Sequence, residues 1–188
     1  MLPLNNRLTK EAQRPVMSIL SRLFGLRGDP RDGLRPLWYR VVEISRLPEY
    51  YARCGVADTV EGRFDMVTQI LSLVLLRMED SRGMKRQAAL LTELFVEDMD
   101  GPLRQTGVGD LMVGKHMGKL LSTLGGRLGA LRDALGAEDD AALVAALERN
   151  VTFAGAADPQ GLAARLRALH ALLRQASDDA VLKGDFAR

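Results

Sequence analysis

The sequence predicts an all-α protein, a single-domain bundle of about six or seven helices. Apolar residues recur at intervals of three and four through most of the chain, which is the spacing of one face of an α-helix. A strand would need alternation with a period of two, and no segment of convincing length has it. With 188 residues, 47% of them hydrophobic, the chain can bury one core and is too short for two large domains.

The first part of the chain is expected to lie outside this bundle. Residues 1–16 are polar and aperiodic, either disordered or an upstream extension, and no function is assigned to them. Residues 17–36 combine a short amphipathic segment with a linker without regular structure, which contains three glycines and two prolines. Seven basic and three acidic residues up to Arg35 give this leader a charge of +4, within a chain whose net charge is +2. The helical domain is predicted over residues 37–188.

Prolines and a pair of carboxylates divide the first half of the helical domain. A helix opened by Pro36 runs until Pro48, which ends it and starts a shorter one. Asp58 and Glu61 have the spacing of a capping box. They predict the start of a long helix that reaches Met78.

Glycine and proline mark the ends of the later helices. A helix that begins near Met84 is predicted to stop where Gly101 and Pro102 interrupt the pattern. A shorter helix covers residues 143–151, and the pair Asp158-Pro159 starts the last long helix.

The helix predicted over residues 117–135 is unusual because it contains several glycines within a regular leucine stripe. These are Gly118, Gly125, Gly126 and Gly129. Each costs about 1 kcal/mol relative to alanine. We therefore predict that packing holds this helix, and that its glycines permit the close approach of a neighbouring helix.

Composition excludes several classes of function. A net charge of +2 and 5% aromatic residues argue against a nucleic-acid partner. A single cysteine forms no internal disulfide, so a reducing cytoplasm suffices. The longest uncharged apolar-rich run, residues 66–76, is shorter than the roughly 20 residues of a membrane span, and no export signal is recognisable. A cytoplasmic location is expected, with peripheral contact at the inner face of the membrane as an option.

The residues that usually carry catalysis do not form a pattern. His116 and His170 are the only histidines, and neither has neighbours at metal-ligand spacing. Cys54 fits a small buried residue at a helix end better than a nucleophile. We therefore expect no catalytic residues, no metal and no cofactor.

Two alternative functions stay open. The segment GDLMVGKH, Gly109–His116, satisfies GxxxxGK but has histidine where a Walker A loop needs serine or threonine. It would make the protein a nucleotide-binding hydrolase, although no strand precedes it. The second alternative is a peripheral membrane protein anchored by its N-terminus, because the amphipathic segment could lie on an anionic membrane surface. We prefer docking of that segment on the protein's own bundle.

Two long segments resemble the ubiquinol-cytochrome c chaperone family. They are Trp38–Val67 and Leu94–Leu120, within a resemblance that covers roughly residues 34–175. The most specific pieces are Tyr50-Tyr51, Gly55-Val56 with Asp58-Thr59, Gly62-Arg63-Phe64-Asp65, Asp98-Met99-Asp100, and Gly107-Val108-Gly109-Asp110 with Lys115.

The resemblance implies a non-catalytic, all-helical assembly factor for the respiratory complex that oxidises ubiquinol and reduces cytochrome c. Its implied partner is newly made cytochrome b, or another subunit of that reductase. Arginine outnumbers lysine 21 to 5 and no organelle presequence is recognisable, which fits a bacterial member.

The family motif supplies the candidate residues for binding a client or partner. They are Tyr50, Tyr51, Asp58, Arg63, Asp98, Asp100, Arg104, Asp110 and Lys115. An alternative is that these residues hold the bundle together, with Arg63 bridging the acidic ones. On that hypothesis Arg63→Ala would lower stability more than a surface substitution does.

Overall fold

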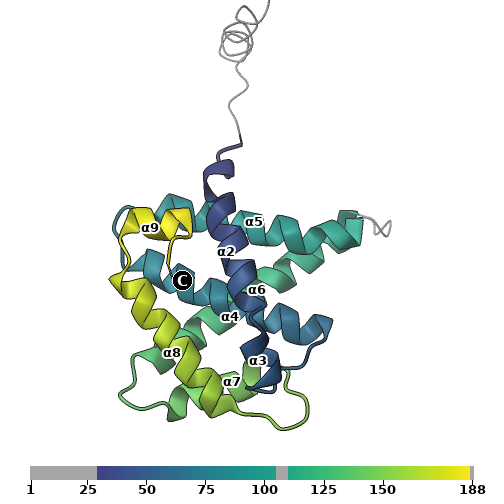
Figure 1. Ribbon diagram of the computed structural model, residues 1–188. Helices are drawn as coiled ribbons and strands as arrows, with labels where there is room; N and C mark the ends of the chain where they lie inside the picture. Colours follow the sequence, from purple (N-terminus) through teal and green to yellow (C-terminus); the bar gives the residue numbers. More distant parts are fainter. Residues whose placement is uncertain (1–28, 105–109, 187–188) are drawn as a thin grey trace, which may run out of the picture. The chain divides into compact units, whose positions relative to one another are not determined.

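The computed structural model describes residues 29–104 and 110–186, and the side chains of residues 29–99 and 117–186. The described elements are the 3-10 helix η1 (Asp32–Leu34) and the helices α2 (Arg35–Ser45), α3 (Pro48–Ala52), α4 (Val60–Glu79), α5 (Lys85–Arg104), α6 (Asp110–Leu135), α7 (Ala141–Asn150), α8 (Pro159–Gln175) and α9 (Asp178–Lys183). The helices α2 to α9 belong to one compact unit, Gly33–Arg188, and confirm the all-α class (Figure 1). The predictions for residues 1–16 and for the amphipathic segment lie outside the described residues.

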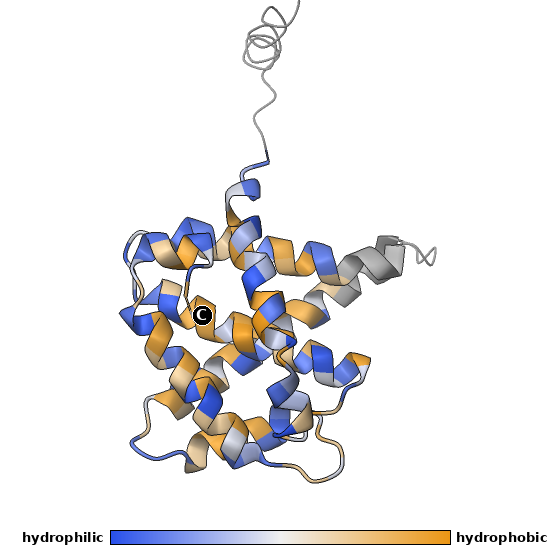
Figure 2. Cartoon of the chain, in the orientation of Figure 1, coloured by the Kyte–Doolittle hydropathy of each residue, from blue (hydrophilic) through white to orange (hydrophobic). Residues whose placement is uncertain are grey.

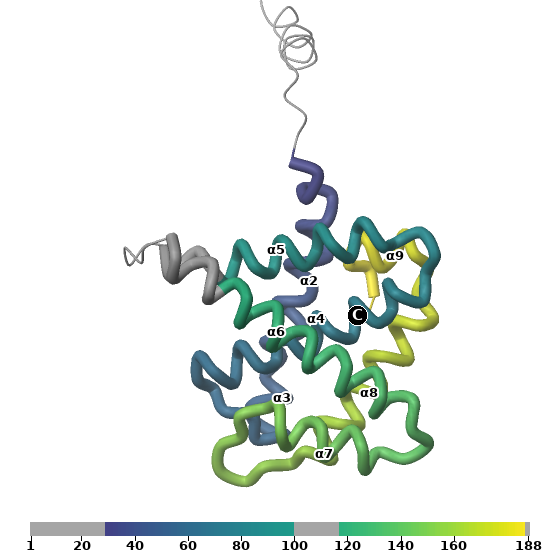
Figure 3. Tube along the Cα trace, turned by 180° about the vertical axis from the view of Figure 1, so that it is seen from behind, coloured from purple at the N-terminus to yellow at the C-terminus, as the bar shows by residue number. Residues whose placement is uncertain are grey.

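Helix α4 is the centre of the bundle. Every residue from Asp65 to Met78 is buried, because α2, α5, α6 and α8 all pack on it. Figure 1 shows α2 on the near side of α4, and Figure 3, from behind, shows α6 crossing the opposite side. The surrounding helices alternate between hydrophilic and hydrophobic residues along their length, as amphipathic helices do (Figure 2).

Small polar residues inside α4 satisfy their hydrogen bonds within the helix itself. The Thr68 hydroxyl donates to the backbone carbonyls of Phe64 (3.1 Å) and Asp65 (2.8 Å). The Ser72 hydroxyl donates to the carbonyl of Thr68 at 2.7 Å. A helix that is enclosed on all sides can therefore carry these residues without an unpaired hydroxyl.

The start of α4 differs from the prediction. Thr59, not Asp58, is the N-cap, and its hydroxyl accepts a hydrogen bond from the backbone N–H of Gly62 at 3.2 Å. Asp58 is engaged by Arg63 instead. The capping-box spacing therefore placed the helix start within one residue but assigned the cap to the wrong side chain.

Two other boundaries also need correction. The linker was expected to lack regular structure up to residue 36, but its end forms η1, and α2 already begins at Arg35. Helix α5 does not stop at Gly101 and Pro102 and continues to Arg104. A proline removes one backbone donor, and so close to the C-terminus of a 20-residue helix that loss falls on the last turns only.

The glycines of α6 do not serve close helix packing. A Cβ atom placed on Gly118, Gly125, Gly126 or Gly129 would meet no heavy atom within 4 Å. Among the described residues nothing lies against these positions, so the prediction that they admit a neighbouring helix of the bundle is wrong. The leucines of the same helix do pack inward, with Leu124 and Leu131 buried.

Helix α8 begins as the sequence predicts, and the short helix α9 after it was not predicted. Asp158 caps α8, and its carboxylate accepts from the backbone N–H of Gly161 at 2.8 Å. Ser177 caps α9 in the same way. Gly184 ends α9 with a φ of 72°, a left-handed conformation that favours glycine.

Candidate functional site

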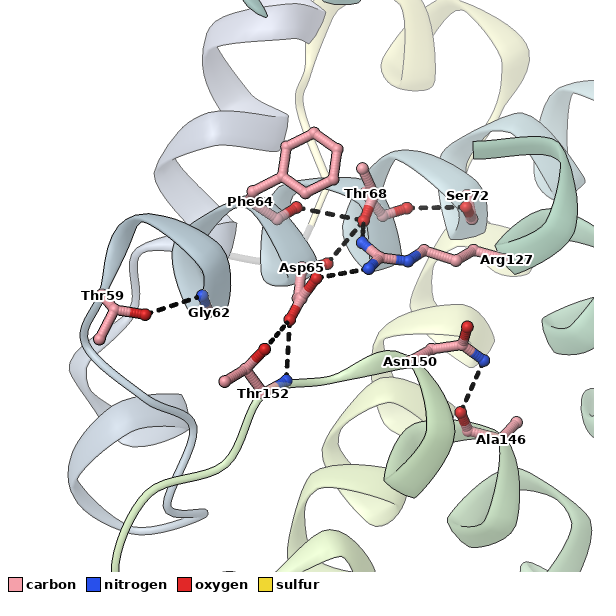
Figure 4. Close-up of polar contacts among 10 residues, drawn as sticks. All are labelled: Thr59, Gly62, Phe64, Asp65, Thr68, Ser72, Arg127, Ala146, Asn150 and Thr152. Carbon is pink, nitrogen blue, oxygen red and sulfur yellow. Dashed lines mark hydrogen bonds and ion pairs between the residues drawn. The ribbon is translucent and has the colours of Figure 1, made fainter. Parts of the chain in front are cut away.

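A buried ion pair connects the N-terminal half of α4 to α6. Asp65 and Arg127 form it, and only 6% and 9% of these residues are exposed. One guanidinium nitrogen of Arg127 bonds the Asp65 carboxylate, and another donates to the Thr68 hydroxyl (Figure 4). The second carboxylate oxygen of Asp65 accepts from Thr152, from its backbone N–H at 2.8 Å and its hydroxyl at 2.7 Å. The carboxylate therefore ties together α4, α6 and the segment that follows α7.

Aromatic rings continue this cluster toward α5. The Arg127 guanidinium lies 5.4 Å from the centre of the Phe64 ring, a cation–π contact. The ring centre of Phe64 lies 6.3 Å from that of Phe95, which lies 6.1 Å from the ring of Trp38. The Trp38 indole N–H donates to the carboxylate of Asp98 at 3.3 Å. An unbroken series of contacts thus leads from the buried Asp65 to the exposed Asp98 on α5.

The turn between α3 and α4 is joined to the loop between α7 and α8. Val56 and Phe153 form an isolated antiparallel bridge. The backbone N–H of Ala57 donates to the Thr152 carbonyl at 2.8 Å, and that of Ala154 to the Gly55 carbonyl at 2.8 Å. These bonds hold Thr152 in position to reach Asp65.

Two motif glycines are required by this close approach. Gly55 has a φ of 71°, and a Cβ there would lie 2.4 Å from the carbonyl oxygen of Ala156. A Cβ on Gly62 would lie 2.0 Å from the carbonyl oxygen of Ala57. Real Cβ atoms do not come so near, so the backbone would have to move to admit any other residue.

We expect Gly62→Ala to lower the free energy of unfolding by about 1–3 kcal/mol, the usual cost of overpacking a filled site. Its Cβ would push the start of α4 away from the Ala57 backbone. Urea unfolding followed by circular dichroism measures the loss. Gly83→Ala is the control, because a Cβ at Gly83 meets no atom within 4 Å. Equal stability of the two variants would contradict the steric argument.

The two tyrosines of the motif belong mainly to the core. Tyr50 is buried, and burial raises the pKa of its hydroxyl to about 12. Tyr51 is half-buried and donates a hydrogen bond to the Ser45 carbonyl at 2.7 Å, and burial raises its pKa as well. Both positions suit a structural role that fixes α3 against the end of α2.

Arg63 and Asp58 form a pair on the surface. The Arg63 Nε lies 2.6 Å from the Asp58 carboxylate, and the two side chains are 60% and 61% exposed. The hydrogen bond from Arg63 lowers the pKa of Asp58. Among the acidic candidates whose side chains are described, Arg63 pairs with Asp58 alone. The side chains of Asp100 and Asp110 lie outside the described residues, so bridging by Arg63 stays a prediction. Arg127, which is not among the candidates, holds a buried carboxylate within the bundle.

The remaining candidates divide between described and undescribed side chains. Asp98 is exposed on α5 and accepts from Trp38. The side chains of Asp100, Arg104, Asp110 and Lys115 lie outside the described residues, and only their places in α5 and α6 are given. Whether these four approach the others stays a prediction.

The structure gives no support to the nucleotide-binding alternative. Residues 110–116 of the GxxxxGK segment are the first turns of α6, and helix α5 precedes them. A phosphate-binding loop of that type follows a buried parallel strand. Among the described residues, no three His, Cys, Asp or Glu side chains come together as metal ligands.

Both the sequence and the fold of this chain are similar to those of known proteins. The sequence model of the family described as "Ubiquinol-cytochrome C chaperone" matches residues 52–188. The chain belongs to this chaperone family. A crystal structure of the Cbp3 homolog from Brucella abortus is similar, with a TM-score of 0.72 and 31% identity over 90% of this chain and 94% of that one. No curated protein sequence matches significantly.

The buried cluster lies within the part of the chain that matches the ubiquinol-cytochrome c chaperone family. The matched residues include Asp65, Arg127 and Thr152, together with the turn around Gly55 and Gly62. In this family member, much of the recognisable motif therefore builds the fold. Within the part of the chain that the structure describes, no helix is both long and apolar enough to cross a bilayer.

The candidate residues chosen from the sequence omit Asp65, Arg127 and Thr152. Arg127 was detectable in principle, because it stands three residues after Leu124 and four before Leu131, on the apolar face of α6. A charge at such a position needs a buried partner. Nothing in the sequence identifies that partner as Asp65 or adds Thr152.

Proposed function

We propose that this chaperone binds newly made cytochrome b and holds it for assembly into the ubiquinol-cytochrome c reductase, without catalytic activity of its own. The family match over residues 52–188 is the observation that carries the proposal. The similar Cbp3 homolog, at 31% identity over almost all of both chains, supports it. Another subunit of the reductase is the alternative client.

The exposed part of the family motif is the surface we assign to client binding. Asp58 and Arg63 present an ion pair at the start of α4, and 81% of the neighbouring Val60 is exposed. Asp98 is exposed on α5. Charges beside an exposed apolar side chain suit the selective recognition of a partner, because charge complementarity sets orientation more than it adds affinity.

Reversal of the surface pair tests this assignment. We expect Asp58→Arg with Arg63→Asp to reduce the recovery of cytochrome b at least tenfold, because the charges a client meets are exchanged. The measurement is co-purification with the tagged full-length chaperone from cells that make cytochrome b, and from cells that lack it. The melting temperature of the variant should stay close to that of the wild type, since both side chains are exposed.

The matched control reverses another exposed pair. Glu79 and Arg132 lie 2.7 Å apart and are similarly exposed. Glu79→Arg with Arg132→Glu should leave recovery unchanged. Equal recovery of cytochrome b by both variants would remove Asp58 and Arg63 from the binding surface. Failure of the wild-type chain to recover cytochrome b would reject the client itself.

We also propose that the chaperone works at the cytoplasmic face of the membrane, where its client is inserted. The basic leader is one candidate for transient contact with that surface, and its residues 1–28 lie outside the described residues. Deletion of residues 1–28 isolates its contribution: liposome co-sedimentation that does not fall on deletion would exclude the leader as an anchor.

A further inference from the structure

A pocket of about 450 Å³ opens at the C-terminal end of α4, next to the end of α8 and the start of α9. Its lining is almost entirely charged: Arg77, Asp80, Ser81, Arg82, Arg174 and Asp178. The Asp65–Arg127 pair joins the N-terminal half of α4 to α6, away from this end of α4. The pocket therefore belongs neither to the buried cluster nor to the surface we assign to the client.

One wall of the pocket is rigid. Arg77 is only 9% exposed, and its Nε donates to the carbonyl of Leu173 at 2.9 Å. Its Nη2 donates to the carbonyl of Ala176 at 2.8 Å and pairs with Asp178 at 2.7 Å. Its remaining nitrogen, Nη1, has no acceptor among the described residues. Arg77, the most buried cation of the pocket, can therefore still donate hydrogen bonds from its Nη1 to a ligand.

The carboxylate of Asp178 is already neutralised. The hydroxyl of Ser81 donates to it, and together with the guanidinium of Arg77 this lowers the pKa of Asp178. Of the other carboxylates at this end, Glu79 pairs with Arg132 and Asp179 pairs with Lys183, each at 2.7 Å. These groups do not offset further positive charge.

Two exposed arginines of the pocket have no such compensation. Arg82 and Arg174 make no ion pair or hydrogen bond with any described residue, and Asp80 is the one pocket carboxylate left to oppose them. Lys85 and Arg86 follow in the first turn of α5, which contains no acidic residue. The pKa of the half-buried His170 is lowered, first by burial and then by the positive charge of Arg174.

We propose that this pocket binds a phosphate group, held by Arg77, Arg82 and Arg174. The planar guanidinium fork matches a phosphate better than any other side chain does, and one fixed and two adaptable arginines can surround three of its oxygens. A phosphate also relieves the excess of positive charge that Asp80 alone leaves. The group has two possible sources, a phospholipid headgroup at the membrane surface or a soluble phosphate, which share this chemistry.

A pair of charge-matched variants tests the proposal in the full-length protein. Arg82→Gln with Arg174→Gln removes the two exposed pocket arginines. Arg53→Gln with Arg149→Gln is the control. Both arginines are exposed and have no ion pair among the described residues. Arg53 lies just after α3 and Arg149 lies on α7, and neither lines the pocket. The two variants have equal net charge and both keep the basic leader and Arg77.

The first measurement titrates sodium phosphate against sodium chloride of equal ionic strength and follows the melting temperature. Phosphate should stabilise the wild type and the control at concentrations where chloride does not. The apparent Kd of the pocket variant should be at least tenfold weaker. The second measurement is co-sedimentation with phosphatidylcholine vesicles with and without phosphatidic acid.

The vesicle measurement identifies the source. Selective loss of phosphatidic acid binding in the pocket variant assigns the site to lipid, and a phosphate response without vesicle binding assigns it to a soluble phosphate. Identical behaviour of the two variants in both measurements would overturn the proposal, and so would a wild type that responds to neither phosphate nor phosphatidic acid.

Discussion

Arg127→Met is expected to lower the free energy of unfolding by about 3–5 kcal/mol, the cost of leaving a buried charge without its partner. The substitution removes the guanidinium that pairs with Asp65 and donates to Thr68, while the Asp65 carboxylate stays 6% exposed. Thr152 still donates two hydrogen bonds to Asp65, but they do not supply a positive charge. Urea unfolding of purified protein measures the loss.

Two further variants show that the loss comes from an uncompensated charge. Asp65→Asn with Arg127→Met removes both charges and should recover part of the stability, because an amide can still accept from Thr152 and methionine packs beside Phe64. Arg132→Met removes an exposed arginine from the same helix and should cost less than about 1 kcal/mol. Similar losses for Arg127→Met and Arg132→Met, or a double variant less stable than Arg127→Met alone, would contradict the argument.

This ion pair explains why the family motif is a poor guide to the binding surface. Asp65, Gly62 and Tyr50 all belong to specific pieces of the motif, yet the structure uses each one inside the bundle. On the proposed function, the Asp65–Arg127 pair serves client binding only indirectly, because it fixes α4 against α6. Among the candidate residues whose side chains are described, Asp58, Arg63 and Asp98 are exposed, and they are the contacts we propose.

The sequence predicts the helices well because helix formation depends mainly on residues that are close together in the chain. The apolar spacing and the prolines at positions 36, 48 and 159 set the starts of α2, α3 and α8, and the structure places each helix start at or next to those residues. Boundaries that depend on which side chain reaches the backbone are less predictable. At α4, Thr59 and Asp58 are both good caps, and in the structure Thr59 caps the helix while Asp58 pairs with Arg63.

The candidate site is harder to predict because its partners are far apart in the chain. Arg127 and Asp65 are separated by 62 residues, and Asp65 meets Thr152 across 87. Spacing rules link residues of one helix, and they contain no information on contacts between helices. Even the surface pair Asp58 and Arg63, only five residues apart, does not follow from these rules, because Asp58 lies before the first residue of α4.

Substitution of the glycines of α6 is expected to have the second large effect on stability, and it raises the free energy of unfolding. We expect alanine at Gly118, Gly125, Gly126 and Gly129 together to raise the free energy of unfolding by about 2–4 kcal/mol, at about 0.5–1 kcal/mol for each position. Alanine restricts the unfolded chain, and its methyl group meets nothing in the folded one. The melting temperature should rise by on the order of 10 °C.

Single variants and one internal control check this prediction. Each of the four substitutions alone should be stabilising, and their effects should add, since none of the new methyl groups contacts another part of the bundle. Gly184→Ala is the control: at a φ of 72° a side chain is strained, so this variant should lose stability. A quadruple variant no more stable than the wild type would show that α6 is not an ordinary helix at these positions.

The recovery of cytochrome b by the quadruple variant then decides why the glycines are present. Proteins commonly give up stability at a surface that must accommodate a partner, and four glycines on the exposed side of one helix give up more than most. Leu121, on the same helix, is 44% exposed. If the more stable variant recovers less cytochrome b, this side of α6 receives the client, because small residues let another helix approach closely. If recovery is unchanged, the glycines do not take part in binding, and Asp58, Arg63 and Asp98 stay the contacts we propose.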